Sequence, residues 1–402
     1  MKALRSLDRW FFGYGSPVTM GLFRILFAGL AVVNLLMVAL YFNSWYTQSG
    51  YSPMEVTRLY AGDDWRINPL RNVAETPWIA AFYAAVVVAG ILTTIGLWTR
   101  VSSILFAIGV VSLHHRNLLI LHGGDTLMRV GLIYVALAPS GAACSVDRLL
   151  ALWRGKAQVP HRAVPLLGQR LVQFNIALLY LTTVWHKRGG TFWFDGTATW
   201  YPAHLPEFHR FWVPEALENS LWFVQLTTYG TLAVELALAT LVFYRPFRKW
   251  VLLAGLAMHA FIEYRFNIPL FAFITTSTYV CFYEGGEVAA WARRFGARLS
   301  RFRVRVELPK GQVLAPDPRR ALEAADPMGW VEYGEGTAET WTATNARGEA
   351  VDPFKASLQR SLGVVPFAGL LVWGRWRAWL EGATRAPEGR SEPSPTATVA
   401  RA

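Results

Sequence analysis

The sequence contains few cysteines and few charged residues. Only two cysteines, Cys144 and Cys281, occur in 402 residues, and charged residues make up 16% of the chain. Two cysteines without a C-x-x-C spacing predict neither a zinc site nor a disulfide framework. The charge content, against about 25% in an average globular domain, argues against a soluble protein. P-loop, GxGxxG and H-E-x-x-H motifs are absent, which excludes the commonest signatures of nucleotide and metal binding.

Hydrophobic and aromatic residues take the place of charge. They are abundant, with 53% hydrophobic residues and 18 tryptophans, and Trp and Tyr favour the two membrane–water interfaces. The composition predicts an integral membrane protein whose surroundings are membrane lipid. The net charge is +12, but Lys and Arg gather in loops, as expected for segments near anionic lipid. We therefore expect no nucleic-acid partner.

Long apolar runs predict an all-α polytopic fold with about eight transmembrane helices. A helix needs about 20 residues to span a bilayer. The runs cover residues 19–42, 77–97, 101–121, 125–139, 164–185, 219–244, 250–267 and 268–283. The last two are short and could instead form one re-entrant element.

The positive-inside rule gives the expected orientation. Lys2, Arg5 and Arg9 place the N-terminus inside, and the first apolar run is too long for a cleaved signal peptide. The loops that alternation then places inside carry Arg100, Arg148, Arg154, Lys156, Arg162, Arg245, Arg248, Lys249 and the tail from Arg293. An even number of spans predicts a protein of the inner (plasma) membrane with both termini in the cytoplasm.

The composition changes after the last apolar run. We expect a transmembrane domain over residues 1–284, a small cytoplasmic extension over 285–384 and a disordered tail over 385–402, which is rich in Pro, Ser, Thr and Glu. "AWARRFGARLSRFRVRV" predicts a basic amphipathic helix on the membrane surface. The alternating segment around Asn345-Ala-Arg-Gly348 predicts a short β-hairpin. "GVVPFAGLLVW" is apolar but too short to span.

The third apolar run ends in the polar stretch "HHRNLLILHGGDTLMR". An ionisable group inside a membrane span is costly and is a functional hypothesis by default. Asp125 begins the next helix and could pair with Arg129 four residues later. A structural ion-pair cluster is the alternative, but the number of polar groups favours a site. The stretch contains His114, His115, Arg116, Asn117, His122, Asp125 and Arg129.

The fifth run carries a polar stripe that ends at a lysine. Gln173, Tyr180 and Lys187 are seven residues apart, so two turns of helix return them to nearly the same face, and Thr183 lies on the same stripe. Cationic neighbours and partial desolvation would favour a neutral amine that could act as a base. The alternative is a lysine that snorkels to the interface.

Other polar residues lie within later and earlier spans. Glu235 stands alone in the middle of the sixth run, and His259 shares a helical face with Glu263 in the seventh. His259 could equally be a core histidine with satisfied hydrogen bonds. Arg24, one turn into the first run, is expected to snorkel. Histidine spacing supports neither haem nor a metal ion, so no metal is expected.

Three stretches of the sequence resemble a known family. "GLFRILFAGL", "HHRNLLILHGGDTLMRVGLIYVALAPSGAACSVDR" and "QFNIALLYLTTVWHKRGGTFWFDGTATWY" are similar to the horizontally transferred transmembrane (HTTM) domain family, which includes the vitamin K-dependent γ-glutamyl carboxylase and its bacterial relatives. The resemblance covers residues 21–284. It implies a carboxylase, a carbon–carbon lyase, that couples oxygenation of reduced vitamin K or another quinol to formation of a strong base. That base deprotonates, and could carboxylate, a substrate.

The resemblance also implies roles for particular residues. Lys187 corresponds to the lysine that deprotonates the hydroquinone. On the same, outer, side, the quinone would be bound by the remaining polar residues: His115, Arg116, Asn117, Asp125, Arg129, Gln173, Tyr180 and His259. The region after residue 284 is much shorter than the lumenal domain with which the animal enzyme grips its substrate, so the acceptor would be a Glu-containing peptide or a small acid. A transporter, or a non-catalytic membrane module with a polar cavity, is the alternative function.

Overall fold

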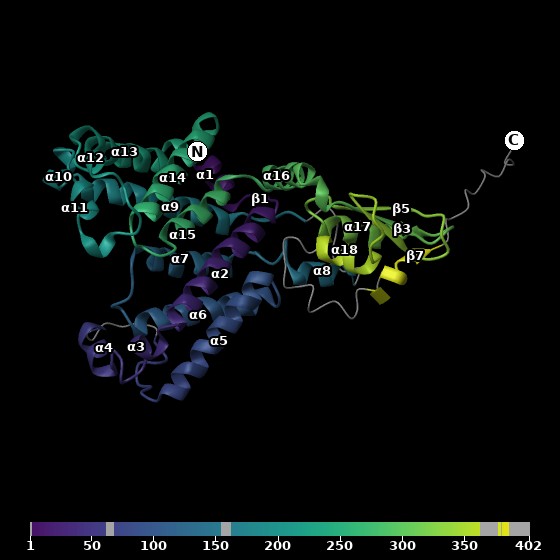
Figure 1. Ribbon diagram of the computed structural model, residues 1–402, viewed down its shortest axis with the longest axis horizontal. Helices are drawn as coiled ribbons and strands as arrows, with labels where there is room; N and C mark the ends of the chain where they lie inside the picture. Colours follow the sequence, from purple (N-terminus) through teal and green to yellow (C-terminus); the bar gives the residue numbers. More distant parts are fainter. Residues whose placement is uncertain (1, 62–67, 154–161, 362–376, 379, 386–402) are drawn as a thin grey trace, which may run out of the picture. The chain divides into compact units, whose positions relative to one another are not determined.

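The structure is a computed structural model that describes residues 2–61, 68–153, 162–361, 377–378 and 380–385. The chain divides into two compact units. Unit 1 comprises residues 1–148 and 161–288, and unit 2 comprises residues 149–160 and 289–402. Unit 1 is helical, whereas unit 2 contains a small β-sheet (Figure 1).

Each of the eight apolar runs forms a helix of unit 1. The last of them begins as an α-helix and tightens into a 3₁₀-helix, η3 (Thr278–Phe282). The eight are α2 (Val18–Ala39), α5 (Thr76–Ile95), α6 (Thr99–Arg116), α7 (Gly123–Leu137), α9 (Leu167–Lys187), α13 (Leu221–Ala239), α14 (Arg245–Arg265) and α15 (Phe271–Ser277).

Shorter elements connect these helices. A two-residue antiparallel pair, β1 (Tyr14–Gly15) with β2 (Val164–Pro165), joins the starts of α2 and α9. The others are α1 (Lys2–Phe12), α3 (Phe42–Tyr46), α4 (Met54–Ala61), α8 (Val146–Trp153), α10 (Thr191–Phe194), α11 (Trp200–Ala203), η1 (Pro206–Phe208), α12 (Glu215–Glu218), η2 (Leu241–Phe243) and α16 (Gly285–Arg298).

Within the described part of the chain, three helices, α2, α5 and α13, are long and apolar enough to cross a membrane. The structure therefore supports a membrane protein, while the count of eight spans stays a prediction. The short final element, Phe271–Phe282, is apolar but only 12 residues long. α6, α7, α9 and α14 carry the polar residues singled out in the sequence, and those residues lower the hydropathy of the helices that hold them.

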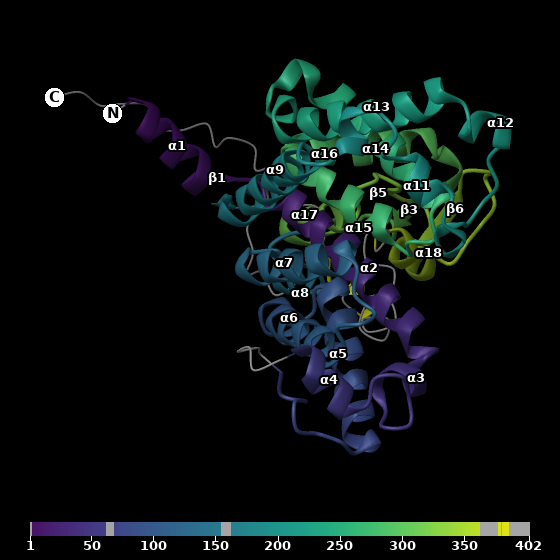
Figure 2. The same cartoon turned by 90° about the vertical axis from the view of Figure 1, so that its left-hand side faces the viewer.

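The long connections of unit 1 lie toward one side of it in Figure 1. α3 and α4, which follow α2, and α10 to α12, which follow α9, are all on the left there, while Figure 2 shows α3 and α4 well apart from α11 and α12. Strict alternation of the helices across a membrane would place both connections on the same side, because both follow an odd-numbered run.

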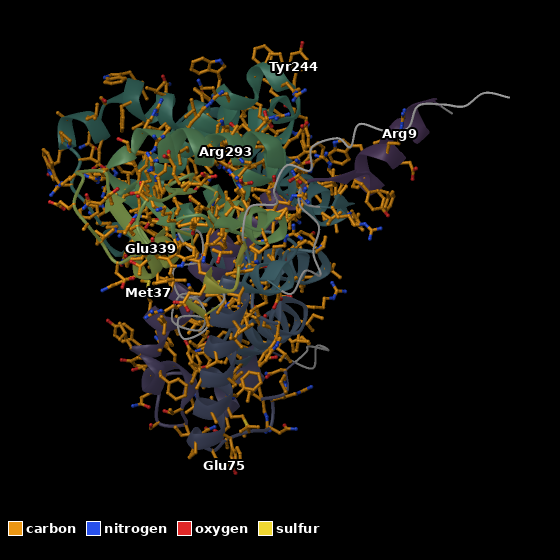
Figure 3. The ribbon with its side chains drawn as sticks, turned by 90° about the vertical axis from the view of Figure 1, so that its right-hand side faces the viewer. Arg9, Met37, Glu75, Tyr244, Arg293 and Glu339 are labelled. Carbon is orange, nitrogen blue, oxygen red and sulfur yellow. The ribbon has the colours of Figure 1, made fainter. Side chains whose placement is uncertain are left out.

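Apolar side chains cover the outside of the helices as well as their inside. Phe23, Phe27 and Phe106 are fully buried between helices, whereas Met37 and Tyr244 project outward and are 41% and 60% exposed (Figure 3). A helix that is apolar all round belongs in lipid or in the core of a large protein. These outward faces suit contact with acyl chains.

Arg24 does not snorkel, contrary to the sequence prediction. Its guanidinium is fully buried and donates to the Thr93 and Thr94 carbonyls, both at 2.5 Å, and to the carbonyls of Ser140 and Cys144. Thr93 and Thr94 lie in the last turn of α5, where the usual i+4 hydrogen bonds of the helix end. Arg24 therefore joins α2 to the end of α5 and to the loop after α7.

Unit 2 corrects the predicted extent of the basic helix in the C-terminal extension. The amphipathic helix predicted over residues 290–306 ends at Arg298, the last residue of α16, and Val304–Val306 belong instead to β3 (Val304–Leu308). Val304, Val306 and Leu308 are buried while Arg305 is exposed, which is the period of two that a half-buried strand requires. The fold is thus mostly helical rather than all-α.

The sheet of unit 2 has the order β5-β3-β6. β5 (Val331–Glu335) runs parallel to β3, and β6 (Thr342–Asn345) runs antiparallel to it. The hairpin predicted around Asn345–Gly348 is present: Gly348 N–H donates to the Asn345 carbonyl at 2.9 Å, and after this turn Val351 N–H donates to the Ala343 carbonyl of β6, also at 2.9 Å. A Thr344–Ala350 bridge pairs the two arms in antiparallel fashion. The remaining elements are α17 (Pro316–Ala325), α18 (Pro353–Ser361), β4 (Val313–Leu314) and β7 (Thr384–Arg385).

Two predictions fall on residues that the structure does not describe. They are the short apolar segment over 363–373 and the tail after residue 385.

Replacing Arg24 tests its role at the end of α5. We expect Arg24→Gln to lower the free energy of unfolding by roughly 3–5 kcal/mol, because several buried carbonyls would lose a charged donor. Arg100→Gln is the control, since Arg100 also donates to a carbonyl, that of Ala136, but is exposed. Equilibrium unfolding in detergent measures both, and equal losses would contradict the assignment.

Candidate functional site

The polar stripe on α9 meets a carboxylate on α13. Lys187 Nζ lies 2.5 Å from Glu235 Oε1, and Thr183 Oγ1 lies 3.3 Å from Glu235 Oε2. The lysine side chain is 21% exposed and the glutamate side chain 10%. The pair forms because α9 and α13 pack side by side and turn these positions toward each other. A lysine that snorkelled to water would need no such partner.

Aromatic rings cover the lysine and separate it from its cationic neighbour. Lys187 Nζ lies 4.6 Å from the centre of the Trp193 ring, whereas the Arg188 guanidinium stacks over Trp185 at 4.2 Å. The charge nearest to Lys187 is therefore the carboxylate of Glu235 and not a cation. This corrects the expectation that like charge surrounds the lysine.

Two helical turns below Lys187, Tyr180 joins α9 to α14 and η3. Its hydroxyl lies 2.8 Å from His259 Nε2 and 3.0 Å from the Tyr279 hydroxyl. Tyr180 and His259 are 2% and 3% exposed. His259 Nδ1 is buried and has no hydrogen-bond partner among the described residues. His259 is thus only half satisfied, unlike an ordinary core histidine.

The second polar cluster lies where α6 ends and α7 begins. His122 and Asp125 form a reciprocal cap, in which Gly124 N–H donates to His122 Nδ1 and His122 N–H donates to Asp125 Oδ2 at 2.8 Å. His114 Nε2 lies 3.9 Å from Asp125 Oδ1. Asp125 therefore caps α7, and Arg129 donates to Thr126 Oγ1 at 3.1 Å.

Hydrogen bonds fix the end of α6 to the chain around α3. The Asn117 amide donates to the Trp45 carbonyl at 2.8 Å and accepts from Leu119 N–H, and Asn68 donates to the His115 carbonyl. Asn117 is fully buried. Arg116, between His115 and Asn117, is also buried, at 1% exposure.

Phe271, the first residue of α15, lies between the two polar clusters. Its ring centre is 6.4 Å from that of His122 and 5.5 Å from that of His259. A Cβ on Gly124 would lie 3.5 Å from this ring and 2.6 Å from His122 Cε1, so the backbone approaches closely only because position 124 is glycine. The structure thus brings α7, α14 and α15 together at one place.

Gln173 lies apart from this place. Its amide donates to the Cys281 carbonyl at 2.6 Å and accepts from Arg170 at 2.9 Å. Gln169 donates to the same carbonyl and to that of Tyr283. These bonds satisfy carbonyls where η3 ends, so Gln173 has a structural role. The polar stripe predicted on α9 is therefore divided: Gln173 serves the fold, whereas Tyr180 and Lys187 belong to the candidate site.

The sequence did not predict how four residues contribute to the site. Glu235 is recognisable as a charged residue in mid-span, but its partner Lys187 is 48 residues away in the sequence, so the pair could not be predicted. Trp193, Phe271 and Tyr279 resemble ordinary membrane aromatics in the sequence, so no local signal distinguishes them. Among the described residues, no group of three or more His, Cys, Asp or Glu side chains is placed to hold a metal ion.

The arrangement can hold and exchange protons in a region shielded from bulk water. In the Lys187–Glu235 pair an acidic and a basic group are in contact. In the Tyr180–His259 pair the hydroxyl and the imidazole nitrogen can each donate or accept the hydrogen bond. Both sit beside aromatic rings. Such a site suits an apolar ligand that carries an exchangeable proton.

The chain belongs to the HTTM domain family, whose model matches residues 15–286. This match includes all eight long helices of unit 1 and confirms the resemblance seen in the sequence. No curated protein and no solved structure matches the chain.

Breaking the buried ion pair should destabilise the protein. We expect Lys187→Met alone to lower the free energy of unfolding by roughly 3 kcal/mol, because Glu235 would keep a buried charge without a partner. The double variant Lys187→Met/Glu235→Leu should recover most of this loss. A double-mutant cycle followed by unfolding in detergent measures the coupling, and additive losses would show that the two side chains do not interact.

Proposed function

We propose that the protein is a membrane enzyme of the vitamin K-dependent carboxylase type. It couples oxygenation of a reduced quinone to deprotonation, and carboxylation where carbon dioxide is captured, of an acidic acceptor. The observation that carries the proposal is the Lys187–Glu235 pair at 2.5 Å beside Trp193. The sequence resemblance matches its lysine to the base of the carboxylases.

The residues around the pair fit a hydroquinone. The ring of such a ligand is flat and apolar, and its two hydroxyl groups need hydrogen-bond partners. Phe271 and Trp193 offer aromatic surfaces, and His259 Nδ1 is a buried acceptor or donor without a partner among the described residues. When bound, the reduced quinone would supply the reaction with dioxygen from which the strong base arises.

The Lys187–Glu235 pair can accept one proton from a ligand, and before it does so the pair has no net charge. As Lys-NH₃⁺ and Glu-COO⁻ the pair is neutral overall. When Glu235 holds the proton of the lysine, the free amine of Lys187 can accept a proton from a ligand hydroxyl, and the pair then carries one positive charge. The 21% exposure of Lys187 leaves the amine open on one side, so this proton can leave the pair. Glu235 thus makes the lysine available as a base.

Removing either partner should stop the reaction. We expect Lys187→Met and Glu235→Gln each to reduce epoxide formation from added vitamin K hydroquinone by at least about a hundredfold, the usual lower bound for a general base. Mass spectrometry of the epoxide, with purified protein and oxygen, gives the rate. Arg188→Met is the matched control, because Arg188 is adjacent but stacks on Trp185, and it should keep nearly full activity.

The same experiment separates the enzyme from the alternatives. Epoxide formation at the wild-type rate in folded Lys187→Met would contradict the proposal. Wild-type protein that forms no epoxide, but moves a solute across liposomes in a way that Glu235→Gln abolishes, would favour a transporter.

A further inference from the structure

Arg116 presents a buried positive charge that nothing in the described part of the chain pairs with. Its Nε, Nη1 and Nη2 atoms are buried and have no hydrogen-bond partner among residues 2–61, 68–153, 162–361, 377–378 and 380–385. The side chain is 1% exposed, so it cannot reach water by extending outward. A buried charge without a partner costs several kcal/mol, and an arginine cannot remove this cost by losing its proton.

The usual partners of such an arginine are already engaged. An arginine in the last turn of a helix commonly bonds the final carbonyls, but the Leu113 carbonyl accepts from Asn117 N–H and the His115 carbonyl accepts from Asn68. The nearby carboxylate, Asp125, caps α7 and faces His114 and His122.

The end of α6 is also rigid. Asn117 is bonded to the Trp45 carbonyl, so the backbone that carries Arg116 is tied to α3. Tyr46, on α3, is buried nearby. Burial raises the pKa of its phenol, Tyr83 and Asp125 act in the same direction, and the charge of Arg116 opposes them. The backbone at Arg116 is therefore fixed, while the donors of its guanidinium have no partner among the described residues.

We propose that the buried end of α6 is an anion-binding site in which Arg116 grips a planar oxyanion of the carboxylate type. A guanidinium presents its N–H groups in a flat fork that matches the two oxygens of a carboxylate or of bicarbonate. The inference rests on the unpartnered guanidinium and not on the function proposed above, so either can fail without the other.

Binding can be measured directly on the full chain in nanodiscs of neutral phosphatidylcholine, which supply no anionic lipid. The thermal midpoint of unfolding is followed against concentrations of sodium acetate or bicarbonate at constant ionic strength, with chloride as the balancing ion, because a ligand of the folded state raises this midpoint. We expect acetate and bicarbonate to raise it in a saturable manner and chloride to leave it unchanged.

Variants at position 116 show where the anion binds. Arg116→Gln should weaken the dissociation constant at least about tenfold, since hydrogen bonds to a charged group are lost. Without any anion it should be as stable as the wild type or more so. Arg116→Lys should lie between the two, because it keeps the charge and loses the fork, and it decides the question if Arg116→Gln does not fold. Arg100→Gln, at the other end of α6, should bind as the wild type does.

Glutamate identifies the source of the oxyanion. A response to glutamate as well as to acetate assigns the site to the carboxylate of a larger acid, and a response to acetate and bicarbonate alone assigns it to a free small ion. Either result supports the site.

Three outcomes would overturn the inference. They are an equal effect of chloride, full affinity in folded Arg116→Gln, and the absence of any saturable effect of acetate or bicarbonate on the wild-type protein.

Discussion

Within lipid, every buried charge and every open helix end must find its partner inside the protein, and unit 1 is organised by this constraint. Arg24 satisfies the carbonyls at the end of α5, and Gln169 and Gln173 satisfy those at the end of η3. Lys187 and Glu235 satisfy each other across α9 and α13. These contacts fix the ends and the rotation of helices whose apolar faces alone would allow several packings.

The candidate site lies where the constraint is only partly met. The Tyr180–His259 bond leaves His259 Nδ1 without a partner among the described residues, and Arg116 is left without one for its whole guanidinium. Buried groups of this kind are rare in native proteins and call for a ligand, a water molecule or a catalytic role. His259 lies on α14 and Arg116 on α6. This separation is consistent with the two proposals, an apolar cofactor near His259 and an anion at Arg116.

Family membership explains the architecture better than it explains the chemistry. The HTTM match covers residues 15–286, all of the long helices of unit 1, yet a fold does not by itself establish a function. The proposed chemistry therefore rests on Lys187 and Glu235. Under that proposal the carboxylate, as the charge nearest to the lysine, would take the proton of the lysine before the amine acts as a base.

The sequence by itself determined the positions of the eight apolar helices and the candidate lysine, because helix length and periodicity are local properties. It assigned residues 304–306 to a basic helix instead of a strand, because the two patterns look alike until β5 and β6 pair with β3. Only the tertiary structure decided that Glu235 faces Lys187, that Gln173 belongs to a helix end and that Arg24 is buried. Each of these depends on which helix packs against which. In a membrane protein the helices are apolar on all sides, so the sequence does not indicate which face of a helix meets which neighbour.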